Sequence, residues 1–120
     1  MAITPKRLGE IQAVNNGAAG TVYAVPASTT AYVRSVTLHN VDTSTRSVQV
    51  WNVPDAAGAV GVAADTNQFI NVDILAGDTV LVEFEAPGII MEDENDSIQA
   101  QADAANKVTI QVSGFEEVES

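Results

Sequence analysis

The chain has 120 residues, carries a formal net charge of −11 at pH 7 and contains no cysteine. This length predicts one domain. The acidic balance argues against nucleic-acid binding, which needs a basic surface to replace counterions, and against an anionic membrane surface. Without cysteine, disulfides and thiolate metal sites are excluded.

The sequence also lacks the apolar segments that direct proteins into or across membranes. No apolar run reaches the roughly 18 residues that a transmembrane helix needs. The cations near the N-terminus are not followed by the apolar core of a signal peptide. We therefore expect a protein that is made in the cytoplasm.

In chain order, the expected elements are short strands separated by turns. A weak strand comes first, and an Asn- and Gly-rich turn leads to a second strand that Pro26 ends, because proline has no N–H for the ladder. No helical period persists over a useful window. The expected strands cover residues 8–14, 21–25, 31–40, 46–53, 68–75, 79–85, 97–102 and 107–114, with a short apolar piece at 89–91.

This spacing determines the predicted fold class. About eight short strands with turn signals roughly every 8–12 residues are typical of an antiparallel sandwich or barrel. We predict an all-β protein, an antiparallel β-sandwich of about eight strands with a jelly-roll-like topology.

Most of the strands alternate between apolar and polar side chains, and one does not. In residues 31–40, Tyr32 and Arg34 share a face with Val36 and Leu38, while Val33 lies on the face of polar residues. Neither face is purely apolar, which indicates a β-bulge or a strand buried partly on both faces.

A small turn-and-strand device occurs twice. Gly77-Asp78-Thr79 and Asn95-Asp96-Ser97 each precede a strand. Gly and Asn tolerate the backbone angles of tight turns, and Asp, Ser and Thr can bond back to the turn backbone. We expect both turns to close at sheet ends and to set the register of the sandwich.

Two segments are candidates for contact with a partner. Residues 1–7 form an extended arm with two of the five cations, which is either a frayed terminus or an arm that reaches an acidic neighbour. The Ala- and Gly-rich loop 54–67 suits contact with another chain. Residues 8–115 would be the sandwich and 116–120 an acidic tail. The predicted contact residues are Ile3, Pro5, Lys6, Arg7, Trp51, Ala57, Val60 and Val62, with Trp51 either in the core or at a contact surface.

The sequence contains no recognisable catalytic constellation. His39 is the only histidine, and no G-x-S-x-G motif accompanies it. The acidic run at residues 92–96 is either a solvated turn or a cation site, and it lacks the EF-hand spacing. We therefore assign no catalytic, cofactor or metal residue and expect no enzyme.

Six stretches of the chain carry a family resemblance. They are ITPKRL at 3–8, YAVPA at 23–27, VRSVTLHN at 33–40, LAGDT at 75–79, DSIQA at 96–100 and VSG at 112–114. With these strands, the chain resembles the small β-sandwich structural proteins of tailed-bacteriophage virions. The resemblance implies a structural protein without enzymatic activity, and among virion roles it favours a head decoration, or cement, protein. Such a protein typically sits as a homotrimer on the outer surface of the head and bridges capsomers of the major capsid protein.

Two alternatives stay open. One is another virion position, in the tail, the neck or the base of a fibre. The other is a receptor- or carbohydrate-binding sandwich. For the decoration role, we expect that deleting residues 1–7 weakens association with the shell without unfolding the sandwich.

Overall fold

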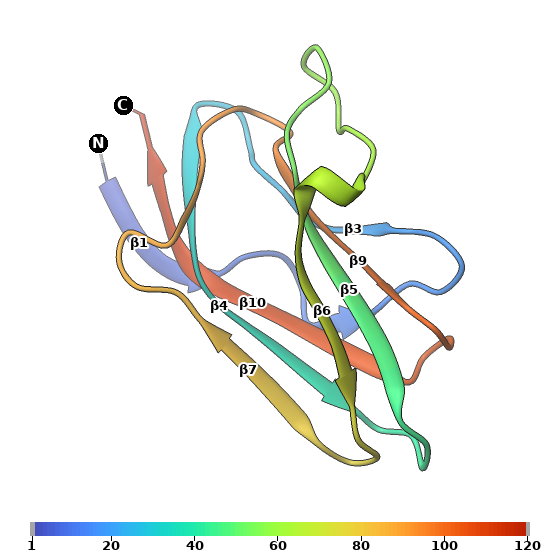
Figure 1. The fold of residues 1–120 in the computed structure, drawn as a ribbon. Coiled ribbons are helices and arrows are strands. Elements are labelled where there is room, and N and C mark those ends of the chain that lie inside the picture. Colours follow the sequence, from blue (N-terminus) through green and yellow to red (C-terminus); the bar gives the residue numbers. More distant parts are fainter. Residues whose placement is uncertain (1, 120) are drawn as a thin grey trace.

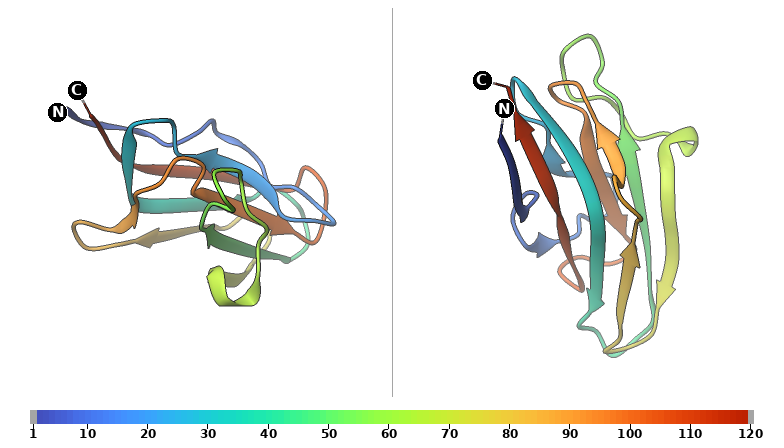
Figure 2. Two further views of the ribbon diagram at one scale, coloured as in Figure 1. Left: turned by 90° about the horizontal axis from the view of Figure 1, so that it is seen from above. Right: turned by 90° about the vertical axis from the view of Figure 1, so that its left-hand side faces the viewer.

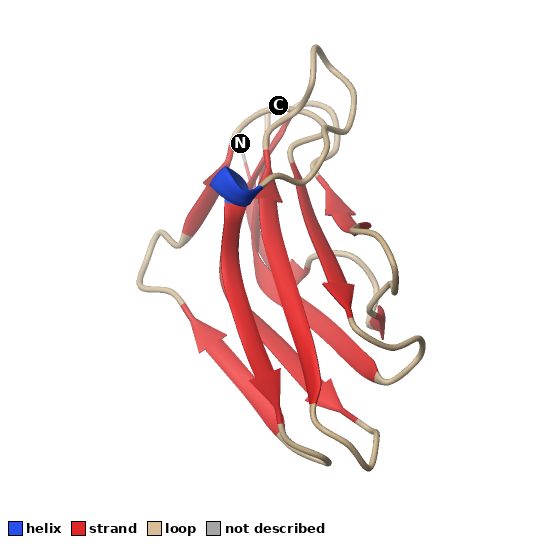
Figure 3. Cartoon of the chain, turned by 45° about the vertical axis from the view of Figure 1, so that its right-hand side comes forward, coloured by secondary structure: helices blue, strands red, loops and turns tan. Residues whose placement is uncertain are grey.

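A computed structural model describes residues 2–119, which form two antiparallel β-sheets packed face to face (Figures 1 and 2). Apart from one turn of 3-10 helix, η1 (Asp65–Asn67), the regular elements are strands (Figure 3). The strands are β1 (Ala2–Arg7), β2 (Gln12–Ala13), β3 (Gly20–Ala24), β4 (Thr29–Asn40), β5 (Arg46–Val53), β6 (Gln68–Ile74), β7 (Thr79–Glu83), β8 (Ile89–Met91), β9 (Ser97–Ala102) and β10 (Val108–Val118).

The strand order is that of a jelly roll. Sheet A has the order β1–β10–β4–β7, with β2 also paired to β10 and β8 also paired to β4. Sheet B has the order β3–β9–β5–β6. Early strands therefore pair with late ones in nested antiparallel hairpins, which wrap around the core as in a jelly roll. The predicted fold class is confirmed.

The core lies between the sheets and is filled by alternate residues of each strand. Val48 and Val50 of β5 pair with Ala102 and Ala100 of β9, and all four are buried. The inward sets predicted for residues 68–75, 97–102 and 107–114 are confirmed by burial of Ile70, Ile74, Ala102, Val108, Ile110 and Val112.

The irregular strand β4 contains the predicted bulge. Val33 pairs with Gly114 and Ser35 pairs with Ser113, so Arg34 is an extra residue on β4. The inward set shifts there from Ala31 and Val33 to Val36 and Leu38. A Cβ on Gly114 would collide with the carbonyl oxygen of Tyr32, which explains glycine at this position.

The ends of the chain differ from the predicted division into arm, sandwich and tail. Residues 2–7 are strand β1, which pairs with the last strand over its whole length, and the expected tail continues β10 to Val118. An extended segment gains ladder hydrogen bonds by adding to a sheet, and Pro5 is tolerated because β1 is an edge strand. Residues 1 and 120 lie outside the described part.

One side-chain cluster fixes β1 to the sandwich. Glu116 is only 7% exposed, and its carboxylate accepts hydrogen bonds from Tyr23 Oη at 2.5 Å and from Lys6 Nζ at 3.1 Å. The acidic neighbour of Lys6 is thus in the same chain. Deleting residues 1–7 would remove an edge strand and the cation beside Glu116, so it should also lower the stability of the sandwich.

Two further segments depart from expectation. The weak strand at 8–14 is reduced to the two residues of β2, flanked by buried Leu8 and Val14. The loop 54–67 is not wholly irregular, because it contains η1 and a tight turn. Gly77 and Asn95 both have positive φ, 75° and 68°, and they close turns at sheet ends as predicted.

Candidate partner-binding lobe

The loop between β5 and β6, residues 54–67, projects beyond the ends of these strands; we call it the lobe (green in Figure 1). It begins at Pro54, which follows the last residue of β5. Two of its apolar side chains lie in solvent: Val62 is 87% exposed and Val60 is 40% exposed. Both were predicted contact residues, and the structure places them together on this projection.

The tip of the lobe is a tight turn. Ala56 and Ala59 exchange hydrogen bonds, N···O 2.7 and 3.1 Å, around Ala57 and Gly58. Both central residues have positive φ, 51° and 88°. Two-residue hairpin turns use this geometry because its twist matches that of the flanking chain. The predicted contact residue Ala57 is therefore the exposed corner of a defined turn.

The lobe is fastened to the turn at residues 92–96. Asp96 Oδ1 accepts a hydrogen bond from the N–H of Asp55 at 2.9 Å, and its Oδ2 accepts one from the N–H of Asp93 at 3.1 Å. Asn95 Nδ2 donates to the carbonyl of Gly58 at 2.7 Å. A loop of this length is thus held in one conformation before any partner arrives.

Trp51 occupies neither of the two places that the sequence left open. It pairs in register with Gln99, on the face of sheet B that points away from the core, yet it is only 6% exposed. Gln99 Nε2 donates to the carbonyl of Gly61 at 2.9 Å, which holds this part of the lobe against the sheet. Trp51 therefore supports the lobe from beneath and presents little of its own surface to solvent.

A shallow groove of about 450 Å³ lies between the lobe and the turn before β3. Trp51, Gln99 and Gln101 form its floor, and Val60 and Val62 stand on one wall. The groove is open to solvent. The apolar and amide groups that line it can bind a surface, but they offer no acid, base or nucleophile.

Three carboxylates meet where the lobe and the turn at 92–96 join. One oxygen from each of Asp55, Asp93 and Asp96 lies within 4.8 Å of the others. Oxygen ligands at such spacing suit Ca²⁺. However, Asp96 and Asp55 already accept hydrogen bonds from main-chain N–H groups, including Gly58 N to Asp55 Oδ2 at 2.9 Å. These hydrogen bonds stabilise the turn of the lobe and fasten the lobe to the turn at 92–96.

The sequence predicted only part of this cluster. Asp93 and Asp96 belong to the acidic run at 92–96, which was singled out as a solvated turn or a cation site. Asp55 comes from the lobe, and nothing local in the sequence connects it to the other two. No lysine or arginine within the described residues 2–119 forms an ion pair with any of the three.

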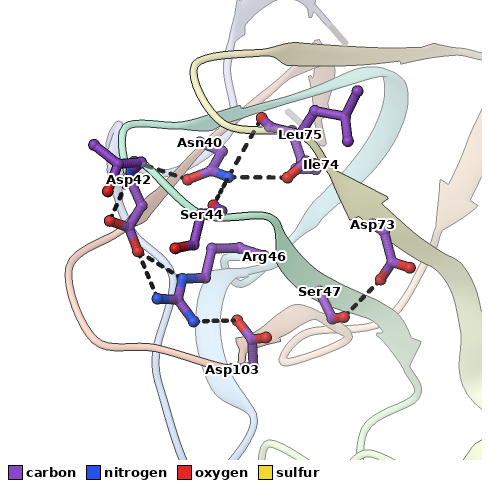
Figure 4. Close-up of polar contacts among 10 residues, drawn as sticks. Asn40, Asp42, Ser44, Arg46, Ser47, Asp73, Ile74, Leu75 and Asp103 are labelled. Atoms are coloured by element: carbon purple, nitrogen blue, oxygen red, sulfur yellow. Dashed lines mark hydrogen bonds and ion pairs between the residues drawn. The ribbon is translucent and has the colours of Figure 1, made fainter.

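The opposite end of the sandwich is closed by a different polar cluster (Figure 4). The side chain of Asn40 is fully buried; its Nδ2 donates to the carbonyls of Ser44 and Ile74, both at 2.9 Å, and its Oδ1 accepts from the N–H of Asp42. One amide thereby joins the β4–β5 turn to the end of β6.

Arg46 is the cation that pairs with the acidic side chains at this closed end. Its Nε donates to Asp42 Oδ2 at 2.7 Å, and its Nη1 lies 3.8 Å from Asp103 Oδ1 (Figure 4). The hydrogen bond from Arg46, helped by the N–H of Thr43, holds the pKa of the Asp42 carboxyl below its ordinary value. The acids here are part of a paired network.

The predicted arm residues are not part of the lobe. Ile3, Pro5 and Arg7 lie on the outward face of sheet A, while Lys6 turns inward to Glu116. The two candidate segments therefore lie on separate surfaces. It missed Phe115, Tyr32 and Ile90, which lie next to Pro5 across the sheet, because cross-strand register is not visible in a local pattern.

His39, Tyr23 and Tyr32 each have a hydrogen-bonding side-chain partner. His39 Nδ1 lies 2.8 Å from the hydroxyl of Thr79, its cross-strand neighbour. Burial, reinforced by the hydrogen bond to Glu116 and by its charge, raises the pKa of Tyr23 far above the ordinary value. Burial and the neighbouring Glu117 raise the pKa of Tyr32. Both tyrosines therefore act as hydrogen-bond donors.

Comparison with known protein-family models finds no match, and comparison with curated protein sequences finds no significant one. Among residues 2–119, no helix has the length and apolar character needed to cross a membrane.

Proposed function

We propose that this chain is a structural protein of a tailed-bacteriophage virion, a decoration protein bound to the outside of the head shell. Its partner would be the major capsid protein, and the chain would stabilise contacts between capsomers. It would have no enzymatic activity. The family resemblance of the strand and turn motifs supports the virion setting.

The observation that carries the binding role is the lobe. It combines exposed Val60 and Val62 with a backbone that Asp96, Asn95 and Gln99 hold in place. A pre-organised loop loses little conformational entropy when a partner covers it, so more of the contact energy remains for affinity. Exposed aliphatic side chains on such a loop suit a permanent structural contact.

Counting the protein in purified virions tests the proposal. A decoration protein is present in many copies per particle, on the outside of the shell, whereas a tail, neck or fibre-base component is present in a handful. A handful of copies would overturn the decoration role and leave the virion role. Absence from purified particles would overturn both.

A single substitution tests the lobe itself. Val62→Asp places a charge in the proposed contact and should lower occupancy on shells by roughly tenfold or more, as for a central contact residue. Leu75→Asp is the matched control, because Leu75 is 62% exposed and lies in the β6–β7 turn at the other end of the sandwich. Equal occupancy for both variants would remove the lobe from the interface.

A receptor- or carbohydrate-binding module is the second candidate, and one observation favours it. Gln101, Gln49 and Asn71 stand in register across the outward face of sheet B. Their amides have no hydrogen-bond partner among the described residues, and all three line one depression. Saturable binding of the isolated protein on a glycan array would support this function, and an array without signal would count against it.

A further inference from the structure

The outward face of sheet A carries an apolar row that crosses four strands. Pro5 of β1 pairs with Phe115 of β10, Phe115 pairs with Tyr32 of β4, and Tyr32 pairs with Ile90 of β8. Directly opposed residues share a face of the sheet, so these side chains form one continuous row. In the right-hand view of Figure 2, β1, β10 and β4 form one outer layer of the sandwich.

The row is accessible to a partner. Ile90 is 46% exposed, and Ile3 and Leu81, on the same face, are 62% and 55% exposed. The guanidinium of Arg34 lies over the ring of Phe115, 5.9 Å from its centroid, and donates to the carbonyl of Phe84. It therefore extends the flat surface and does not stand out from it.

The face carries only a small part of the net charge of −11. The register and the Phe115 contact place Arg7, Arg34, Glu83 and Glu117 on it. Glu92, which follows β8, lies near Tyr32 at the edge of the face, so two cations stand among three acids. Most acidic residues lie on the turns, so two copies that meet through this face avoid most of the mutual repulsion.

The charges are also placed in a self-complementary way. The row next to the apolar one runs Arg7, Ser113, Ser35, Glu83 from β1 to β7. It is positive at one edge of the sheet, where Arg7 also pairs with the exposed carboxylate of Glu10 at 3.3 Å, and negative at the other. A two-fold axis parallel to the strands, between β10 and β4, exchanges the two edges and would bring Arg7 opposite Glu83 of the second copy.

The same axis brings the apolar row of one copy against the apolar row of the second copy. It places Phe115 opposite Tyr32 of the second copy and Pro5 opposite Ile90 of the second copy. Two sheets packed face to face with nearly aligned strands are a common arrangement in β-proteins. An isologous interface requires that residue i meets residue j while j meets i, and these rows fulfil that condition.

We propose that the outward face of sheet A binds a second copy of this chain in a two-fold symmetric dimer. The arrangement differs from the homotrimer that the family resemblance implies, because a self-complementary face closes at two copies and a ring of three needs two different surfaces. Addition of a strand to β1 is disfavoured because Pro5 interrupts the donors of that edge. The proposal does not depend on the virion role.

The mass of the purified full chain in solution tests the proposal. We expect a concentration-dependent species of twice the 12.5 kDa chain mass in sedimentation equilibrium. The ionic strength should be about 0.15 M, where the Debye length of about 8 Å screens the acidic turns. A monomer at every concentration, or a species of three chains, would overturn the proposal.

Charge exchange tests the axis. Arg7→Glu and Glu83→Arg should each weaken the dimer by about tenfold or more, because two like-charged pairs form by symmetry. The double variant restores opposite charges and should restore the dimer. Lys107→Glu and Glu94→Arg are matched controls, since they change the net charge equally at exposed turns. A double variant as weak as the single ones would contradict the two-fold axis.

An apolar variant tests the row with a second readout. Ile90→Glu should give a monomer, whereas Leu75→Glu, an equally drastic change outside the face, should leave the dimer intact. The urea midpoint of each variant shows whether the fold persists. Dimers of Ile90→Glu as stable as the wild type would exclude the apolar row from the interface.

Discussion

The two ends of the sandwich hold their acidic side chains in different surroundings. At the closed end, Asp42 and Asp103 share the guanidinium of Arg46, and the buried amide of Asn40 joins two turns. At the lobe end, the carboxylates of Asp55, Asp93 and Asp96 gather with main-chain N–H groups as their partners. In residues 2–119 no cation is paired with them.

The closed end is held together by buried polar contacts, whereas the lobe end exposes its side chains to solvent. A buried amide that satisfies several main-chain groups makes the closed end costly to open, because each carbonyl released inside the protein would lack a partner. The lobe end is joined by fewer, more exposed bonds and displays apolar side chains. We therefore expect the closed end to contribute more to global stability, and the loss of a contact at the lobe to affect the lobe more than the rest of the sandwich.

The largest expected effect is that of Asn40→Ala. The substitution removes the donor to the carbonyl of Ile74 in a buried site and to that of Ser44 in a partly buried one, so the free energy of unfolding should fall by about 3 kcal/mol. Urea denaturation monitored by circular dichroism measures it. Asn71→Ala, on an exposed face without side-chain partners among the described residues, should change stability little. Equal losses of stability in the two variants would mean that the side chain of Asn40 does not hold this end of the sandwich together.

An intermediate effect is expected at the lobe. Asp96→Ala removes two hydrogen bonds but also relieves repulsion among three carboxylates, so the global loss should be only about 1 kcal/mol. Hydrogen exchange at the amides of Asp55 and Asp93 should accelerate more than exchange in β5. In Asp65→Ala, which alters an exposed acid of the same loop, exchange at these amides should be unchanged. Uniform acceleration over the sandwich would show that the lobe is not a separate unit.

The smallest effect is the dependence of the closed end on pH. Since Arg46 lowers the pKa of Asp42 in the folded chain, ionisation of Asp42 and folding favour each other. That contribution is present above the unfolded-state pKa and is lost as the pH falls through the folded-state value. Arg46→Gln should therefore be less stable than the wild type near neutral pH, and the difference in the free energy of unfolding should become smaller below about pH 4. A difference that did not change with pH would contradict the ion pair between Arg46 and Asp42.

Local patterns predicted the fold because burial alternates along each strand. The inward sets at Val48 and Val50, at Ile70 and Ile74, and the bulge near Arg34 all follow from period-two reasoning. What the sequence could not provide is which strand lies beside which. The pairing of β1 with β10, and hence the row through Pro5 and Phe115, joins opposite ends of the chain.

The same limit applies to the lobe. Its exposed valines could be predicted, since an Ala- and Gly-rich loop offers little else to bury them. The carboxylate of Asp96 that fastens it comes from a distant turn, and Trp51 is buried on the outward face, beside Gln99, which holds Gly61 of the lobe. These contacts depend on tertiary placement, which a one-dimensional pattern does not encode.

The position of Trp51 has a practical consequence for spectroscopy. It is the only tryptophan of the chain, and it lies under the lobe and outside the main hydrophobic core. Its emission therefore reports on whether the lobe rests against sheet B, while circular dichroism reports on the strands. The unmodified protein thus carries its own optical sensor for the lobe, and a ligand or neighbour that seats on it can be followed without a label.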